Sequence, residues 1–135
     1  MIKKNFKKKS KVLIFGLAYN AEKTISETIK RLPLSDKNYD FEILIIDDAS
    51  SDNTFIKAKK SKKNNSSLKV TILRNPVNQG YGGNVKIGFM HAIKNDFDYI
   101  ALTHADGQYP PEEIPKQLKL LLSNRYDVIF GSRMM

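Results

Sequence analysis

The sequence lacks the features that mark several specialised classes of protein. Its 135 residues include no cysteine, which excludes disulfide bonds and removes any sign of an oxidising compartment. No apolar run approaches the roughly 18 residues that a membrane-spanning helix needs, and the start, "MIKKNFKKKSK", is not followed by the apolar core of a signal peptide. We therefore expect one cytoplasmic domain over residues 11–135, preceded by a basic tail over residues 1–10.

Acidic residues and arginines are few relative to lysine. The formal net charge is +9, from 23 basic and 14 acidic residues, and much of the excess lies in residues 3–11 and 57–65. Such lysines could be a solvated surface, or could attract an anionic membrane surface or nucleic acid. Nucleic acid is the least favoured partner, because the lysines lack interleaved aromatic residues and no recognition motif is present.

The remaining sequence alternates between apolar segments of strand length and segments with helical spacing. The apolar segments are bounded by turn residues, and the helical segments place apolar residues every three or four positions. Apolar strands that alternate with helices predict a mostly parallel sheet covered on both faces, a Rossmann-like α/β fold. We expect strands at 11–18, 41–48, 68–75, 98–103 and 126–132, and helices at 21–32, 51–63, 82–95 and 112–124.

Polar segments follow each predicted strand, and ligands of such sheets bind beyond the carboxyl ends of the strands. One of these segments, "DDAS", begins with Asp47 and Asp48. Adjacent residues of an extended chain point to opposite sides, so we expect one aspartate to face a ligand. The other, with Ser50 or Ser51, is suited to cap the next helix, for which Ser51 or Asp52 is the expected N-cap.

The segment "HADGQ" has alternate polar residues. On an extended chain His104, Asp106 and Gln108 project to one side, and Gly107 allows a bend. One carboxylate with neutral ligands suits an octahedral divalent ion that keeps water and takes phosphate oxygens, while the imidazole favours Mn²⁺ over Mg²⁺. The alternative is a turn before the next helix, in which Asp106 and His104 only bond the backbone.

The segment "NQGYGGNVKIG" (78–88) is rich in glycine but fits neither the dinucleotide-binding nor the P-loop pattern. Gly82 and Gly83 at a helix start would let backbone N–H groups approach a phosphate or a base; a flexible turn is the alternative. Arg133, after the last predicted strand, has a guanidinium suited to phosphate, although a lone arginine there is commonly a surface residue.

Five segments in this order resemble family 2 glycosyltransferases of the GT-A fold, and in particular the polyprenyl-phosphate (dolichyl-phosphate mannose synthase-like) group. The resemblance covers residues 11–133. It implies inverting transfer of a sugar from a UDP- or GDP-sugar to a polyprenyl phosphate or saccharide, as in polysaccharide biosynthesis, with Mn²⁺ or Mg²⁺. The segments are "AYNAE", "IIDDASSDNT", "NQGYGGNVKIGFMHA", "HADGQYPPEEIP" and "DVIFGSR".

The resemblance also implies roles for residues that would bind the nucleotide. Ala18 and Tyr19 would line the pocket for the base, and Asp48 would accept a hydrogen bond from the base or the ribose. Gly82 lies in the glycine-rich segment that would approach the phosphates. His104 is a further candidate contact, to the ribose.

"HADGQ" occupies the place of the family's D-x-D motif. By position Asp106 would coordinate the metal on the donor diphosphate, with Gln108 as a supporting ligand and His104 as a third candidate. Arg133 falls where related enzymes hold an acceptor phosphate. A lipid phosphate would be met at the membrane surface, so we expect the protein to be cytoplasmic and peripheral to the inner face of the membrane.

The sequence departs from the family in two ways. His104 replaces the first aspartate of D-x-D and removes a negative charge from the site. The chain ends at Met135, whereas family members continue with the acceptor-binding half and any catalytic base, so no base is assigned. Two hypotheses follow: the donor-binding part of a metal-dependent glycosyltransferase, which by itself need not be active, or a nucleotide-sugar-binding module without turnover.

Overall fold

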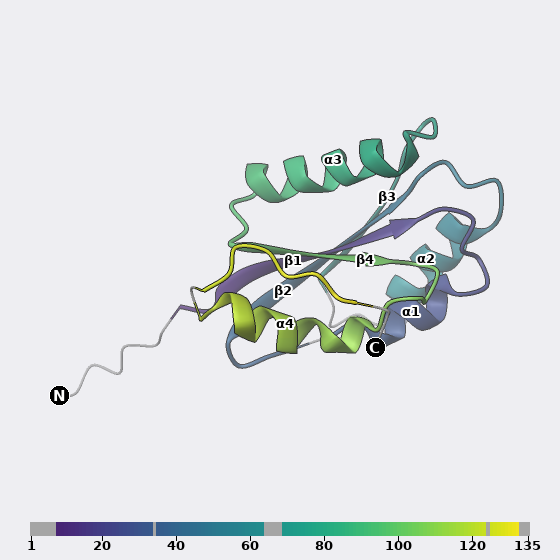
Figure 1. The fold of residues 1–135 in the computed structure, drawn as a ribbon. Coiled ribbons are helices and arrows are strands. Elements are labelled where there is room, and N and C mark those ends of the chain that lie inside the picture. The colour runs from purple at the N-terminus through teal and green to yellow at the C-terminus, as the bar shows by residue number, and fades with distance from the viewer. Residues whose placement is uncertain (1–7, 34, 64–68, 124, 133–135) are drawn as a thin grey trace.

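The computed structural model describes residues 8–33, 35–63, 69–123 and 125–132. Within these residues the chain forms one four-stranded sheet in the order β3-β2-β1-β4, and each neighbouring pair is parallel. Figure 1 shows α3 on one face of this sheet and α1, α2 and α4 on the other. The predicted parallel α/β sheet with helices on both faces is confirmed. The strands are β1 (Ser10–Ala18), β2 (Tyr39–Asp47), β3 (Val70–Arg74) and β4 (Tyr99–His104).

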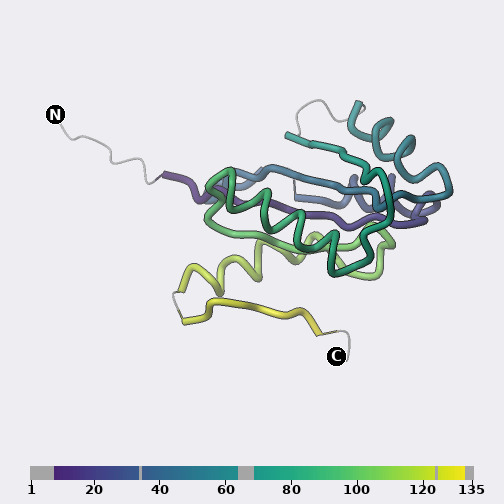
Figure 2. The backbone as a smooth tube through the Cα atoms, turned by 90° about the horizontal axis from the view of Figure 1, so that it is seen from above, coloured from purple at the N-terminus to yellow at the C-terminus, as the bar shows by residue number. Residues whose placement is uncertain are grey.

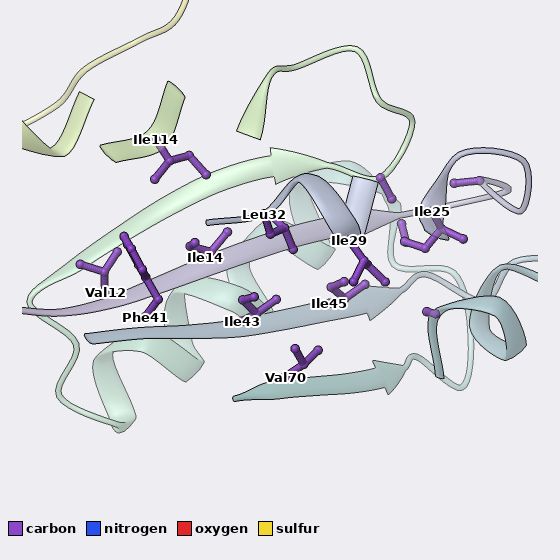
Figure 3. Close-up of a cluster of buried hydrophobic side chains, with 14 of the residues drawn as sticks. Val12, Ile14, Ile25, Ile29, Leu32, Phe41, Ile43, Ile45, Val70 and Ile114 are labelled. Carbon is purple, nitrogen blue, oxygen red and sulfur yellow. The ribbon is translucent and has the colours of Figure 1, made fainter. Parts of the chain in front are cut away.

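Each of the two central strands contains a continuous apolar run, because both faces of the sheet are covered there. Along β1, Val12 and Ile14 face the side of α1, whereas Leu13 and Phe15 belong to the cluster on the side of α3. Figure 3 shows the first cluster, in which β1 and β2 side chains meet Ile25 and Ile29 of α1 and Ile114 of α4. A strand buried on both sides cannot alternate apolar with polar residues, which explains the continuous run "VLIFGLA".

All four helices lie within or overlap the predicted ranges, with ends that differ by a few residues. The first begins four residues later than predicted, because a turn at residues 22–24 precedes it. The last is preceded by a 3₁₀ turn, η1 (Pro111–Glu113), and accepts Pro115 in its first turn, where the missing N–H has no partner to lose. The helices are α1 (Ile25–Arg31), α2 (Thr54–Lys63), α3 (Gly80–Lys94) and α4 (Ile114–Leu121).

The predicted strand over residues 126–132 is wrong. Residues 125–132 form no strand and pair with none of the described strands. Val128 is 63% exposed and Phe130 89%, and Figure 2 shows the segment in yellow, outside the sheet and beside α4. An alternating apolar pattern makes a strand only where a neighbouring strand pairs its backbone groups. Arg133, which the prediction placed at the end of this strand, lies outside the described residues.

Within the described residues, no helix has both the length and the apolar composition that crossing a membrane requires.

Candidate functional site

A pocket of about 380 Å³ opens at the carboxyl ends of β1 and β4, beside the first turn of α3. Its volume falls within the range of small-ligand sites. Its position is the one expected for an open parallel sheet, where the loops that follow the strands surround the ligand. The lining consists of Leu17, Ala18, Tyr19, Ala21, Asp48, Asn78, Gly80, Tyr81, Asn84, His104 and Asp106.

Five residues predicted from the sequence meet in this pocket. Ala18 and Tyr19 come from the end of β1, Asp48 follows β2, and His104 and Asp106 lie at and after the end of β4. They come from three segments far apart in the sequence. Parallel pairing brings them together, because β1 lies between β2 and β4 and all three strands end at the same edge.

Three other predicted residues are placed differently. Gly82 lies in the first turn of α3 but outside the lining, where Gly80, with a φ of 72°, takes its place. Gln108 is exposed and also outside the lining. The alternate spacing of "HADGQ" therefore places two side chains in the pocket, not three, because the chain turns at Gly107, with a φ of 76°. Arg133 is not among the described residues.

The loop after β4 is fixed to α1 through its backbone. The N–H of Ala105 donates to the carbonyl oxygen of Leu17 at 2.8 Å. The carbonyl oxygen of Ala105 accepts hydrogen bonds from the Thr24 and Thr28 hydroxyls at 2.8 and 3.2 Å. Ala105 itself is buried, so its two polar neighbours in the sequence are held in the pocket lining by a rigid backbone.

Asp106 combines a turn with an open carboxylate. Its Oδ1 accepts a hydrogen bond from the N–H of Gln108 at 3.0 Å, which is the turn expected as the alternative reading of this segment. Oδ2 has no hydrogen-bond partner among the described residues, and the side chain is exposed at the pocket. The turn therefore does not exclude ligand binding: it orients the carboxylate and leaves one oxygen available.

His104 lies close to two tyrosine rings. Its ring centroid is 5.6 Å from that of Tyr81 and 4.9 Å from that of Tyr109. Tyr81 is in the first turn of α3 and is not among the residues predicted from the sequence. The available signal was an aromatic residue inside the glycine-rich segment that opens the helix. Tyr81 and His104 line the pocket together with Asp106, whereas Tyr109 lies outside the lining; aromatic rings in a pocket suit the flat face of a sugar or a base.

Asp48 is 4% exposed, and its carboxylate is held by donors. Oδ1 accepts hydrogen bonds from Asn75 Nδ2 at 2.7 Å and from the N–H of Gln79 at 2.8 Å. Asn78 Nδ2 donates to the carbonyl oxygen of Asp48 at 3.1 Å. These contacts tie the end of β2 to the start of α3, and the two asparagines that hold Asp48 were not among the residues predicted from the sequence.

Asp47 has a different environment, as expected for adjacent residues of a strand. It is 1% exposed; Oδ1 accepts a hydrogen bond from the Ser50 hydroxyl, and Oδ2 lies 3.3 Å from Arg74 Nε. The latter contact is an ion pair without hydrogen-bond alignment, and it compensates the buried charge. Asp47 therefore supports the loop, whereas Asp48 faces the pocket.

Asp52, one of the two predicted caps of α2, joins the helix to the loop after β1. Its Oδ1 accepts from the N–H of Thr54 at 2.9 Å and its Oδ2 from the N–H of Glu22 at 3.2 Å. The Thr54 hydroxyl in turn accepts from the N–H of Ala21 at 2.8 Å. Burial opposes ionisation, but the hydrogen bonds from Thr54 and Glu22 outweigh it and lower the pKa of Asp52.

Asp52→Ala is expected to lower the free energy of unfolding at pH 7 by about 1–2 kcal/mol, the usual effect of losing a cap. Because the pKa is lowered in the folded state, the stabilisation is present at neutral pH and is lost as pH falls through that lowered value. The difference in the free energy of unfolding between Asp52→Ala and wild type should therefore become smaller below about pH 4. Urea unfolding at a series of pH values measures it. Asp127→Ala, at an exposed aspartate with no hydrogen bond to the other described residues, removes the same charge without removing a cap and should leave the free energy of unfolding at pH 7 unchanged.

An open parallel sheet with a pocket across the carboxyl ends of its strands defines a Rossmann-like α/β ligand-binding domain. Solved structures place it more narrowly, in the GT-A fold. A mannosyltransferase from Pyrobaculum calidifontis in complex with GDP-Man and Mn²⁺ superposes with a TM-score of 0.72 and 20% identity, over 84% of this chain and 33% of that one. The family described as Glycosyl transferase family 2 matches residues 14–135, and the chain belongs to this family.

Two curated relatives have names that state a reaction. A UDP-N-acetylglucosamine–dolichyl-phosphate N-acetylglucosaminyltransferase of Methanococcus voltae is 32% identical, over 86% of this chain and 49% of its own length. A dolichol-phosphate mannosyltransferase of Pyrococcus furiosus is 31% identical, over 91% of this chain and 33% of its own length. The chain thus spans half or less of these two relatives.

Proposed function

We propose that the chain is the donor-binding part of a metal-dependent glycosyltransferase that transfers a sugar, with inversion, from a nucleotide-diphosphate sugar to an acceptor such as a polyprenyl phosphate. The observation that carries this proposal is the meeting of Ala18, Tyr19, Asp48, His104 and Asp106 in one pocket at the strand ends. The P. calidifontis structure contains GDP-Man and Mn²⁺, which supports a nucleotide-sugar ligand for the same fold.

The nucleoside end of the donor would occupy the side of the pocket formed by β1 and Asp48. Asp48 accepts two hydrogen bonds through Oδ1, which orients its carboxylate so that Oδ2 can accept from a base N–H or a ribose hydroxyl. Ala18 is small and buried, and Tyr19 is exposed beside it. A base could stack on the Tyr19 ring, because the face of the ring offers contact area free of polar groups and the hydroxyl lies at its edge.

The residues at the end of β4 fit a divalent ion that takes most of its ligands from the substrate. They offer one carboxylate with a free oxygen, Asp106 Oδ2, and one imidazole, that of His104, in the same lining. No three His, Cys, Asp or Glu residues in the described parts of the chain form a metal cluster of their own. Mg²⁺ or Mn²⁺ held by one or two protein groups and by diphosphate oxygens suits this set. Such an ion would neutralise charge on the departing diphosphate.

The acceptor is proposed to be a phosphate of a polyprenyl lipid. The names of the M. voltae and P. furiosus relatives both contain a dolichyl or dolichol phosphate. A phosphate is already ionised at neutral pH, so it can attack the anomeric carbon without a general base. Arg133 is proposed to hold this phosphate, since a guanidinium binds phosphate through two parallel hydrogen bonds.

Calorimetric titration with UDP, GDP and CDP, each with Mn²⁺ and with a chelator, tests the proposal. We expect binding of UDP or GDP that depends on the metal. No binding of any nucleotide in the presence of Mn²⁺ would contradict it. The alternative, a binding module without turnover, is separated by incubation with UDP-sugars and GDP-sugars, since release of the sugar shows that the chain supports bond cleavage.

A further inference from the structure

Helix α2 presents a basic face to solvent. Thr54, Ala58 and Ser61 are buried against the sheet, and the opposite side of the helix carries Ile56, Lys59, Lys60 and Lys63. These four residues are spaced i, i+3, i+4 and i+7, which aligns them in one stripe. The stripe has no acidic residue, and α2 as a whole has none. We call these four residues the α2 stripe.

The lysines of the α2 stripe are not neutralised by the protein. Elsewhere, Lys30, Lys69 and Lys116 form ion pairs with carboxylates. In the described residues no carboxylate lies within ion-pair distance of Lys59, Lys60 or Lys63. Among the described residues, their ammonium groups have one contact: Lys59 Nζ lies 5.4 Å from the centroid of the Phe55 ring. Three like charges on one side of a helix repel one another unless an anionic partner offsets them.

Two further features show what kind of anion fits. A hollow of about 300 Å³, lined by Lys59, Lys62, Lys63 and Ile72, lies beside the stripe and could receive a phosphate headgroup. Ile56 is 64% exposed in the first turn of the helix. An apolar side chain among lysines is unfavourable in water but favourable at the boundary between headgroups and acyl chains.

We propose that the α2 stripe is a docking surface for a membrane that contains anionic phospholipids. The lysines attract the negatively charged surface, and Ile56 inserts between headgroups. Because α2 follows the loop that starts at Asp48, docking would hold the pocket edge near the bilayer. The proposal does not depend on the identity of the nucleotide or of the sugar.

Nucleic acid is the competing anion, and the composition of the face argues against it. The α2 stripe carries lysine but no arginine, whose guanidinium provides the commonest base and phosphate contacts. Phe55, the one aromatic residue of α2, lies outside the stripe; it is half-buried and faces Lys59 and Arg74, so it is not presented for base stacking. An exposed isoleucine has no partner on a phosphate backbone.

Flotation with lipid vesicles tests the proposal on the full chain. We expect the protein to float with vesicles of phosphatidylcholine and phosphatidylserine, and not with phosphatidylcholine alone. Each lysine near such a surface contributes about fivefold to the partition coefficient, so K59Q/K60Q/K63Q should lower it by on the order of 100-fold. Ile56→Ala should lower it severalfold without changing the charge, and raised salt should weaken wild-type binding.

The matched control is K86Q/K94Q/K119Q, which removes three exposed lysines of α3 and α4. Both variants have a net charge of 9 − 3 = 6, and both keep the basic run at residues 3–11. The partition coefficient of the control onto the vesicles should lie within about fivefold of the wild-type value. An equal loss in both variants would overturn the proposal, and so would flotation independent of phosphatidylserine. Binding of duplex DNA that needs the α2 stripe, without vesicle binding, would assign the face to nucleic acid. Thermal unfolding of each variant checks that α2 remains folded.

Discussion

Asp106→Ala is expected to lower the affinity for a nucleoside diphosphate in the presence of Mn²⁺ by about 100-fold, or about 2.7 kcal/mol. The substitution removes the one carboxylate at the proposed metal position. Residues that only orient a metal ligand are worth about 10- to 100-fold in affinity, so a direct ligand should reach the upper end of that range. In the presence of a chelator the variant and the wild type should bind equally weakly.

Asp36→Ala is a close control for this substitution. Asp36 Oδ1 accepts a hydrogen bond from the N–H of Asn38, two residues on, at 2.6 Å, as Asp106 does from Gln108. Asp36 precedes β2, so it lies at the opposite edge of the sheet from the pocket. The control therefore removes the same charge and the same turn bond, and should leave nucleotide affinity unchanged. If Asp106→Ala kept the metal-dependent affinity, the site assignment would be wrong.

Gly88→Ala is expected to lower the free energy of unfolding by about 3 kcal/mol. A Cβ atom at position 88 would lie 2.1, 2.3 and 2.6 Å from three carbon atoms of the Phe15 ring. Phe15 is fully buried between β1 and α3, and close-packed cores leave no space for the ring to move into. The helix would have to shift away from the sheet, and the pocket wall formed by α3 would shift with it.

Gly82→Ala, in the same helix, is the control: it replaces a glycine by alanine without a clash like that between position 88 and the Phe15 ring. A Cβ atom there meets no other atom within 4 Å, and alanine has the higher helix propensity, so this variant should be more stable than wild type by about 0.5–1 kcal/mol. Urea unfolding measures both variants. If Gly88→Ala had the same free energy of unfolding as the wild type, α3 would not pack on Phe15 as described.

Much of the site was predictable because it depends on the order of apolar and polar segments along the chain. The run "VLIFGLA" and its counterpart in β2 are apolar without interruption, which requires strands covered on both faces. Once a parallel sheet is assumed, the segments after the strands must meet at one edge. On this ground the segments that contain Ala18, the Asp47–Asp48 pair and Asp106 were expected in one site, and the pocket lining contains a residue of each.

Other parts of the site were not predictable because they depend on contacts between distant segments. Asn75 is an unremarkable loop residue in the sequence, yet its amide donates to the Asp48 carboxylate across 27 positions. Tyr81 reaches His104 because α3 begins beside the end of β4. Gln108 was expected beside Asp106, but the turn at Gly107 takes it out of the lining.

The sequence by itself determined the alternation of strands and helices, the parallel sheet and the edge of the sheet at which the polar segments lie. The reason is that a strand buried on both faces has a continuous run of apolar residues, which can be recognised in the sequence. The strand pattern left open which of two adjacent aspartates faces the pocket, and the tertiary structure decided it in favour of Asp48, since the partners of Asp47 and Asp48 come from other segments. The tertiary structure also decided that residues 126–132 form no strand. Their pattern is that of a strand, but pairing needs a neighbouring backbone, and the described sheet provides none beside them.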